Sequence, residues 1–318
     1  MINGLIADIG GTNVRFALVN EYGETLKIEN LLCRDFAGPV EAVQAYYEKV
    51  GINGNRPRRA AFCVAAPVNQ DRIDVTNNHW DFSQIEVKRK LGLDTLKIVN
   101  DFTAVALSAP RLHANDYVKV GTGKAKEGPI AVLGPGTGLG VSGLLYGEHK
   151  QFIPISGEGG HVALAAVNDR ESEVLTQLRR DVGFVSAERV LSGFGMVNLY
   201  NAVLTLAGQA RVDVNAAEIT RLALQEQDPV ALETVDLFCG FLGTVASDMA
   251  LTLFATGGVF IAGGIVPKLG EAFAKSSFRS HFDEKGIYTD LMQTIPTMVI
   301  THPHPAFVGL SSMVLSRT

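Results

Sequence analysis

Cysteine is scarce in this 318-residue chain, whose three cysteines, Cys33, Cys63 and Cys239, lie far apart. Their spacing matches neither a metal-binding motif nor a disulfide framework. Cys63 and Cys239 lie in apolar runs, so we expect them to be small core residues. Cysteine usage of this kind is typical of a reducing compartment, and we expect a cytoplasmic protein.

The chain also lacks an excess of charge. Its net charge is −5, with 19% charged and 47% hydrophobic residues, as in an ordinary globular protein. This balance gives no reason to expect nucleic acid or a membrane surface as a partner. A short basic run, Arg56-Pro57-Arg58-Arg59, has no aromatic residues interleaved and is expected to be a solvated loop.

Targeting and membrane-spanning segments are not evident either. Asp8 and Arg15 interrupt the apolar N-terminal stretch and no basic region precedes it, so a signal peptide is not expected. The most apolar long segment, residues 230–254, contains Glu233, Asp236 and Asp248. These acidic residues favour a buried helix over a membrane span.

Two common nucleotide-binding motifs are missing as well. The chain has no G-x-x-x-x-G-K-[ST] sequence, which excludes a P-loop. Its Gly134-x-Gly136-x-Gly138 run is not followed by a helix pattern, so the dinucleotide-binding fingerprint fails too.

What the chain does contain is two glycine hairpins of one design. The first covers residues 6–18 and the second residues 131–141; each is an apolar run, a Gly-Thr tip and a second apolar run. The tips are 136 − 11 = 125 residues apart. Glycine has no Cβ, so backbone N–H groups there can approach phosphate oxygens. Either loop alone fits a tight β-turn equally well, but the repetition predicts a nucleotide held between two related domains.

Strand-like runs alternate with helix patterns, which predicts an α/β fold. Strands are expected at residues 5–9, 14–19, 60–65, 96–99, 139–146 and 259–264, the last with a glycine turn, and the pattern is mainly helical after residue 146. Helices are expected at residues 39–50, from Ser83 to near Gly92, from Asn215, and from Asp228 to Gly257-Gly258. The two halves should meet near residues 108–115.

Several motifs together resemble one family. Asp8-Ile9-Gly10-Gly11-Thr12-Asn13 resembles the first phosphate loop of sugar kinases in the actin/hexokinase superfamily, residues 134–140 the second, and residues 260–267 the adenosine segment. Asn100-Asp101-Phe102-Thr103-Ala104, residues 157–161 and residues 185–193 are similar to bacterial glucokinase. The matches run in order over nearly the whole chain.

The resemblance implies a fold and a reaction. The fold has two related α/β domains with mixed sheets flanked by helices and an active-site cleft between them. Residues 1–110 form the small domain, residues 111–304 the large one, and residues 305–318 a C-terminal helix that packs back on the small domain. The implied reaction is ATP-dependent phosphorylation of the 6-hydroxyl group of glucose by a Mg²⁺-dependent homodimer.

The resemblance also implies site residues. Asp101 would be the general base, and Asn100, Asp101, Glu158, His161 and Glu188 would bind the sugar. Asp8, Ile9, Gly10, Gly11, Thr12, Asn13, Gly136, Thr137, Gly138, Gly263 and Gly264 would bind the nucleotide. Asp8 would orient Mg²⁺ through water, because Mg²⁺ keeps several waters. Asn77 and Asn78 are weaker candidates for lining the cleft.

Local sequence alone leaves other roles open for these residues. Asn100 or Asp101 could be a helix N-cap, and Asp8 could cap the hairpin turn. His161 could be a structural histidine. Glu188 could sit in the first turn of a helix capped by Ser186, where the helix dipole favours an acid. The His302-Pro303-His304 run fits a turn before the final helix better than a metal site.

Two departures from related families narrow the function. No cysteine follows His161 until Cys239, so the cysteine-rich zinc motif of the related repressor/kinase family is not expected. The first strand begins within a few residues of Met1, so no N-terminal helix-turn-helix is expected. The alternatives are a kinase for another hexose or an amino sugar, a non-catalytic sugar-sensing regulator, and a chaperone-like ATPase, which would need a second, peptide-binding domain.

Overall fold

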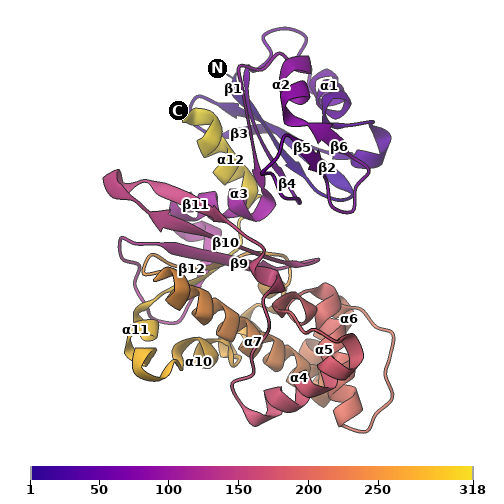
Figure 1. The fold of residues 1–318 in the computed structure, drawn as a ribbon, viewed down its shortest axis with the longest axis vertical. Coiled ribbons are helices and arrows are strands. Elements are labelled where there is room, and N and C mark those ends of the chain that lie inside the picture. Colours follow the sequence, from indigo (N-terminus) through magenta and orange to yellow (C-terminus); the bar gives the residue numbers. More distant parts are fainter. Residues whose placement is uncertain (1, 317–318) are drawn as a thin grey trace. The chain divides into compact units, whose positions relative to one another are not determined.

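The computed structural model describes residues 2–316, and the chain divides into two compact units (Figure 1). Unit 1 runs to Leu112 and resumes at Pro303, and unit 2 spans His113–His302. The predicted meeting point at residues 108–115 contains the first boundary. Short 3₁₀ and π turns are labelled η below.

Unit 1 is a five-stranded mixed sheet with helices on both faces. Its elements are β1 (Ile2–Ile9), β2 (Asn13–Asn20), β3 (Thr25–Leu32), η1 (Cys33–Asp35), α1 (Pro39–Lys49), β4 (Arg59–Val64), β5 (Arg72–Asp74), β6 (Asp81–Ser83), α2 (Gln84–Lys90), β7 (Thr95–Asn100), α3 (Asp101–Ser108), η2 (Ala109–Arg111) and α12 (Pro305–Leu315). The strand order is β3-β2-β1-β4-β7, and β5 pairs with β6 separately.

Alternation along β1 shows why both faces of this sheet are covered. Leu5, Ala7 and Ile9 belong to the core under α1, whereas Ile6 belongs to the core under α12. Side chains of a strand point alternately to opposite faces, so a strand with apolar residues at consecutive positions needs a cover on each side. Helix α12 provides the second cover together with α3, against which it packs (Figure 1).

Unit 2 repeats this plan and enlarges it. Its elements are η3 (Ala114–Asp116), β8 (Tyr117–Val120), β9 (Ile130–Pro135), β10 (Leu139–Tyr146), η4 (Glu148–Lys150), β11 (Phe152–Ser156), η5 (Gly159–His161), α4 (Asp169–Val182), η6 (Ala187–Arg189), α5 (Gly193–Leu206), α6 (Ala216–Arg221), η7 (Leu222–Glu226), α7 (Pro229–Leu253), β12 (Gly258–Ile261), α8 (Val266–Leu269), α9 (Glu271–Lys275), α10 (Phe278–Asp283), η8 (Gly286–Tyr288), α11 (Thr289–Thr294) and β13 (Thr297–Ile300). The strand order is β11-β10-β9-β12-β13-β8.

The two sheets share their topology. In each, an antiparallel three-stranded meander (β1–β3, β9–β11) is followed by two strands parallel to the first (β4 and β7, β12 and β13). Strand β8 is an antiparallel addition to unit 2. The prediction of an α/β fold with two related domains is confirmed.

The third strand of the second meander was missed. The sequence pattern predicts mainly helix after residue 146, but β11 follows at once and pairs with β10. Pro154 obscures it, because proline in the middle of a strand is tolerated mainly at the edge of a sheet, and β11 is the edge of its sheet.

Helix α7 is the buried helix predicted from residues 230–254. It is long and apolar enough to cross a membrane, yet 72% of its most apolar window is buried within the fold. Asp228 caps it by accepting a hydrogen bond from the Ala231 amide, as expected. Its predicted end at Gly257-Gly258 was wrong: the helix ends at Leu253, because Phe254 takes the left-handed conformation (φ 51°).

Candidate active site

The first glycine loop joins β1 to β2, and its inner carbonyl group is held by two donors. Gly10 N–H donates to the Asn13 carbonyl at 2.9 Å, closing the turn. The Gly10 carbonyl accepts from Asn78 Nδ2 at 2.9 Å and from Cys33 Sγ at 3.7 Å. These bonds fix the loop at Gly10. They involve neither the Gly11 amide nor the Thr12 amide.

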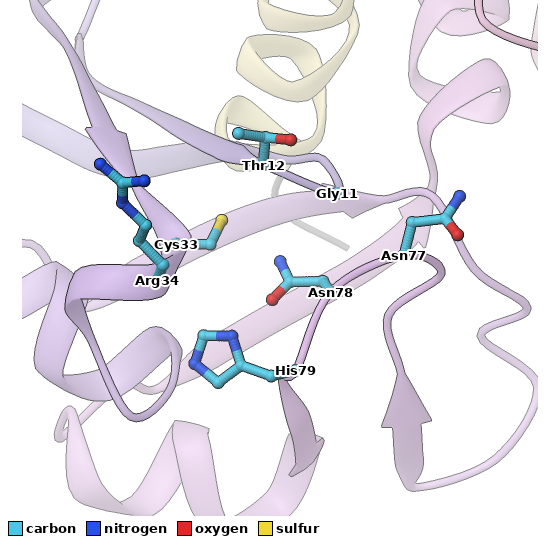
Figure 2. Close-up of a pocket in the computed structure, with 7 residues that line it drawn as sticks. All are labelled: Gly11, Thr12, Cys33, Arg34, Asn77, Asn78 and His79. Carbon is cyan, nitrogen blue, oxygen red and sulfur yellow. The ribbon is translucent and has the colours of Figure 1, made fainter.

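A cavity of about 490 Å³ lies against this loop (Figure 2). Figure 2 shows Cys33 and Asn78 pointing toward each other below the Gly11-Thr12 segment, with Arg34 and His79 farther out. The complete lining is Gly11, Thr12, Cys33, Arg34, Asn77, Asn78 and His79. A side chain on Gly11 would start 3.1 Å from the Asn77 carbonyl, so glycine is what lets these segments approach.

Sequence reasoning pointed to Asn77 and Asn78 but missed Cys33 and Arg34. These two follow β3, and the Cys33 amide donates to the Thr12 carbonyl at 2.9 Å. The contact depends on the pairing of β3 with β2. Because β3 is a largely exposed edge strand with a weak pattern, the sequence holds no clear signal for it.

Asp8 lies on β1 between two partners on neighbouring strands. Cys63 Sγ on β4 donates to its Oδ1 at 3.4 Å, and Arg15 Nη1 on β2 lies 3.3 Å from its Oδ2. Both contacts follow from strand register, which sets Asp8 opposite Arg15 and opposite Cys63. Burial raises the pKa of Asp8, and Cys63 and Arg15 offset only part of that rise.

Asn100 and Asp101 lie at the same sheet edge as the first loop. Strands β1, β4 and β7 are parallel, and their register aligns Ile9 with Val64 and Val64 with Asn100. The carboxyl ends of parallel strands are where α/β sheets bind ligands. Asp8 and Asp101 both raise the pKa of the buried Cys63 thiol, after the larger effect of its burial. The register sets Cys63 opposite Asp8 on β1 and opposite Val99 on β7, two residues before Asp101.

The helix-cap role considered for this pair belongs to Asn100. Its Oδ1 accepts from the amides of Phe102 at 2.9 Å and Thr103 at 3.4 Å, which starts α3. Asp101, the first residue of α3, also accepts from the Phe102 amide at 2.9 Å and is half-buried. The cap holds the backbone of Asp101 at the mouth of the sheet, and its role as a base stays a prediction.

In unit 2, the second glycine loop lies beside the Gly263-Gly264 turn. Strands β9 and β12 are parallel; the Ala262 amide donates to Leu133 at 2.8 Å and the Ile265 amide to Pro135 at 3.4 Å. The predicted nucleotide residues of unit 2 (Gly136, Thr137, Gly138, Gly263 and Gly264) therefore gather at one sheet edge. A Cβ on Gly136 or Gly264 would meet nothing within 4 Å, so both glycines border open space that a nucleotide could enter.

The predicted sugar residues of unit 2 come from two paired turns. Glu158 precedes η5 and His161 is its last residue, and the His161 N–H donates to the Glu158 carbonyl at 3.0 Å. Glu188 belongs to η6, which is tied to the chain after η5 by the Ala187 amide donating to Val162 at 2.9 Å and by a bridge between Ala163 and Ser186. Glu158 and His161 are exposed and Glu188 is half-buried.

The alternative role considered for Glu188 is not what the structure shows. Ser186 makes no side-chain cap, and η6 is a single 3₁₀ turn rather than an α-helix. The Glu188 Oε2 atom instead accepts a hydrogen bond from the Leu139 amide at 2.8 Å. Glu188 is thereby attached to the second glycine loop, a contact no sequence pattern indicated.

The donor set suits Mg²⁺ held through water rather than a closed metal site. Among residues 2–316, no group of three or more His, Cys, Asp or Glu could hold a metal ion. Asp8, a partly exposed carboxylate beside a glycine loop, fits an ion that keeps most of its waters and takes its other ligands from phosphate. His304 directly precedes α12, which agrees with the turn expected there.

The site residues thus form two groups, one in each unit. In unit 1 the first loop, Asp8 and Asn100-Asp101 share one sheet edge, and in unit 2 the second loop, the Gly263-Gly264 turn and the η5 and η6 turns are linked together. Each group combines glycine loops suited to phosphate with side chains suited to hydroxyl groups.

Comparison with known proteins gives a family match over nearly the whole chain. Residues 5–317 match the family model described as Glucokinase. The glucokinase of Paramagnetospirillum magneticum is 48% identical over 312 residues, covering 98% of this chain and 97% of that protein.

Solved structures agree. A crystal structure of glucokinase from an Antarctic psychrotroph has a TM-score of 0.90 and 34% identity, covering 98% of each chain. A ROK family glucokinase from Streptomyces griseus, solved in complex with glucose and AMPPNP, has a TM-score of 0.63 and covers 98% of each chain. At 19% identity, this second likeness shows a shared fold alone.

Proposed function

This chain belongs to the glucokinase family of sugar kinases, and we propose that it transfers the γ-phosphoryl group of ATP to the 6-hydroxyl group of glucose. The products are glucose 6-phosphate and ADP. The observation that carries the proposal is the shared sheet edge of unit 1, where the first glycine loop and Asn100-Asp101 meet through the register of β1, β4 and β7.

Asp101 is the proposed general base. The 6-hydroxyl oxygen attacks the γ-phosphorus and the bond to the bridging oxygen of ADP breaks, while Asp101 accepts the hydroxyl proton. The Asn100 cap supports this role because it fixes where α3, and therefore Asp101, begins. Such transfer depends mainly on positioning and charge stabilisation, which a rigid helix start can provide.

The remaining roles follow the two groups of residues. Asn100, Glu158, His161 and Glu188 are proposed to bind the sugar hydroxyls, which both donate and accept hydrogen bonds. The residues from Asp8 to Asn13, the Gly136–Gly138 segment and the Gly263-Gly264 turn are proposed to bind ATP. The 48% identical relative from Paramagnetospirillum magneticum, which is named glucokinase, supports glucose as the sugar. A cleft that brings both groups to one substrate pair remains a prediction.

Asp8 is proposed to orient Mg²⁺ through water. When bound with ATP, the ion would neutralise charge on the phosphate oxygens. A carboxylate whose pKa burial has raised is well suited to a cation, because the cation relieves the cost of its ionised form. Cys63 and Arg15 hold the two oxygens of that carboxylate in place.

Quaternary structure and compartment are further proposals. The three cysteines are free thiols and all are buried, which supports a reducing cytoplasm. A homodimer is proposed from the family resemblance alone. Light scattering coupled to size-exclusion chromatography tests it, and a mass of 34.0 kDa would make the protein a monomer.

A coupled assay tests the function as a whole. The protein is supplied with Mg-ATP and, separately, glucose, mannose, fructose or N-acetylglucosamine, and ADP release is recorded. We expect the highest kcat/KM with glucose. A preference for another sugar would favour the alternative of a different hexose or amino-sugar kinase. Sugar binding by calorimetry without any turnover would favour a sugar-sensing regulator.

A further inference from the structure

The two glycines that flank Thr137 in the second loop have different surroundings. A Cβ on Gly136 would meet nothing within 4 Å. A Cβ on Gly138 would collide with the Glu188 Oε2 atom, and the Glu188 Cδ atom would lie only 3.3 Å from it. Gly136 therefore borders open space, whereas the missing side chain of Gly138 makes room for a carboxylate that lies 50 residues further along the chain.

The collision would fall on the hydrogen bond that holds the Glu188 carboxylate among residues 2–316. Oε2 accepts from the Leu139 amide at 2.8 Å, and Leu139 directly follows Gly138. The other carboxylate oxygen, Oε1, does not take part in this hydrogen bond and could accept from a sugar hydroxyl. A carboxylate bound at one oxygen by a fixed backbone donor is pre-oriented at the other, which lowers the entropy cost of binding.

The backbone of Glu188 is fixed independently of this contact. Its carbonyl accepts from the buried Ser192 hydroxyl at 2.8 Å, and the neighbouring Ala187 amide donates to Val162 at 2.9 Å. A methyl group on Gly138 would therefore displace the flexible end of the Glu188 side chain rather than the η6 turn. The turn holding Glu158 and His161 packs on the same strand, because Gly160 lies against the Leu139 carbonyl.

We propose that Gly138 is a positioning residue for sugar recognition: its lack of a side chain lets the Leu139 amide hold Glu188 in the orientation that binds a sugar hydroxyl. Gly138 thus acts through Glu188, and the second glycine loop takes part in sugar binding before any nucleotide arrives. This inference rests on the proposed function, in which Glu188 binds the sugar.

The test measures glucose affinity by calorimetry without nucleotide, a quantity that a purely phosphate-binding glycine would not change. Gly138→Ala should weaken glucose binding by roughly 10-fold or more, as expected for a displaced charge-assisted hydrogen bond. Gly136→Ala, one position before Thr137 in the same loop, should keep glucose affinity within about 2-fold, since its methyl group meets open space. Wild-type affinity in Gly138→Ala would overturn the inference.

A double variant separates positioning from a second, independent effect. If Gly138 acts only through Glu188, then Gly138→Ala combined with Glu188→Gln should bind glucose no more weakly than Glu188→Gln alone. Additive losses would overturn the inference. Wild-type protein that turns over no sugar would instead remove the proposed function, so the two failures are distinguishable.

Hydrogen exchange provides a readout if Gly138→Ala folds poorly. The Leu139 amide should exchange faster in Glu188→Ala, which has no acceptor, than in Glu188→Gln, whose amide oxygen can still accept. Equal exchange at Leu139 in the two folded variants would show that the contact does not hold the carboxylate, and the inference would fall.

Discussion

The two glycine hairpins share a topology and obtain their carboxylate from different places. In unit 1, Asp8 belongs to the hairpin itself and faces Arg15 across the strand pair. In unit 2, residues 130–146 contain no acidic residue, and Glu188 reaches Leu139 from a turn 49 residues away. The comparison teaches that a repeated backbone motif can be completed by unrelated side chains, which a search for matching residues would miss.

The comparison also separates two proposed tasks. The carboxylates of unit 1, Asp8 and Asp101, lie where phosphoryl transfer is proposed, whereas Glu188 in unit 2 is proposed to bind sugar. If this division between the carboxylates of the two units holds, substitutions of Asp8 or Asp101 should act on turnover and substitution of Glu188 on affinity. The variants below test it in order of expected effect.

Asp101→Asn should have the largest effect. Asparagine keeps the shape of the side chain but cannot accept a proton, so kcat should fall by roughly 10²–10⁴-fold while glucose affinity changes little. Steady-state kinetics and calorimetry measure the two quantities. Asp94→Asn is the matched control in unit 1, because the Asp94–Arg58 pair is exposed and such pairs contribute little. Retention of more than about a tenth of kcat by Asp101→Asn would remove the base role.

His281→Ala should lower the free energy of unfolding. The expected loss is similar in size to the rise in activation free energy expected for Asp101→Asn. Glu171 on α4 is 1% exposed and accepts from the Val167 amide at 2.8 Å, and its other oxygen lies 2.7 Å from His281 Nε2 on α10. Removing one partner of a fully buried pair costs about 3–5 kcal/mol, and this pair, with Glu171 buried and His281 half-buried, should approach the lower end of that range. Urea unfolding, followed by a probe in unit 2, should show this loss. Ser280→Ala, an exposed change on the same helix, should not.

The same pair should make stability depend on pH. The hydrogen bond to Glu171 is the main cause that raises the pKa of His281 above 6.5, with Asp236 on α7 adding to it. A raised histidine pKa stabilises the fold fully below pH 6.5, and the stabilisation is lost as pH rises through the raised value. The stability gap between wild type and His281→Ala should therefore narrow at alkaline pH. A gap that widens would contradict the assignment.

How far the sequence predicts these features depends on their range along the chain. Local signals succeeded: Ser83 and Asn215 cap α2 and α6 as expected, each accepting from the amide three residues on. The strands flanking both glycine loops were also predicted.

The features that the sequence did not predict depend on pairing between distant segments. Strand β11, the Cys33 contact and the Leu139–Glu188 bond arise only once the sheets form. Their residues carry no periodicity or cap that would mark them, and in β11 a proline points away from a strand.

Glu188→Gln should have an intermediate effect on kinetics. Glutamine can still accept from the Leu139 amide through its oxygen, but it presents an amide NH₂ group, which only donates, where Oε1 would accept from the sugar. A charge-assisted bond of about 1.5–3 kcal/mol corresponds to a loss of roughly 10- to 150-fold in kcat/KM for glucose. The melting temperature should change little. A clear drop in melting temperature with unaltered kcat/KM would make Glu188 a structural residue.

Asp8→Asn should have the smallest effect on stability, and its sign is informative. Burial raises the pKa of Asp8, so its ionised form opposes folding at neutral pH, and asparagine removes that cost. The melting temperature should therefore rise slightly at pH 7, and the advantage should shrink as pH falls and Asp8 becomes protonated. Asp94→Asn is the matched control. Arg58 lowers the pKa of Asp94, so this substitution should lower the melting temperature slightly at pH 7.

Kinetic measurements on Asp8→Asn show whether Asp8 also has a role in turnover. A residue kept at a cost to stability needs a function to retain it, and for Asp8 that function is proposed to be the orientation of Mg²⁺. Asp8→Asn should raise the Mg²⁺ concentration needed for half-maximal kcat while leaving glucose affinity without nucleotide unchanged. A stabilised variant with the Mg²⁺ dependence of the wild type would assign Asp8 to the hairpin turn. A loss of glucose affinity would instead break the division of tasks between the two units.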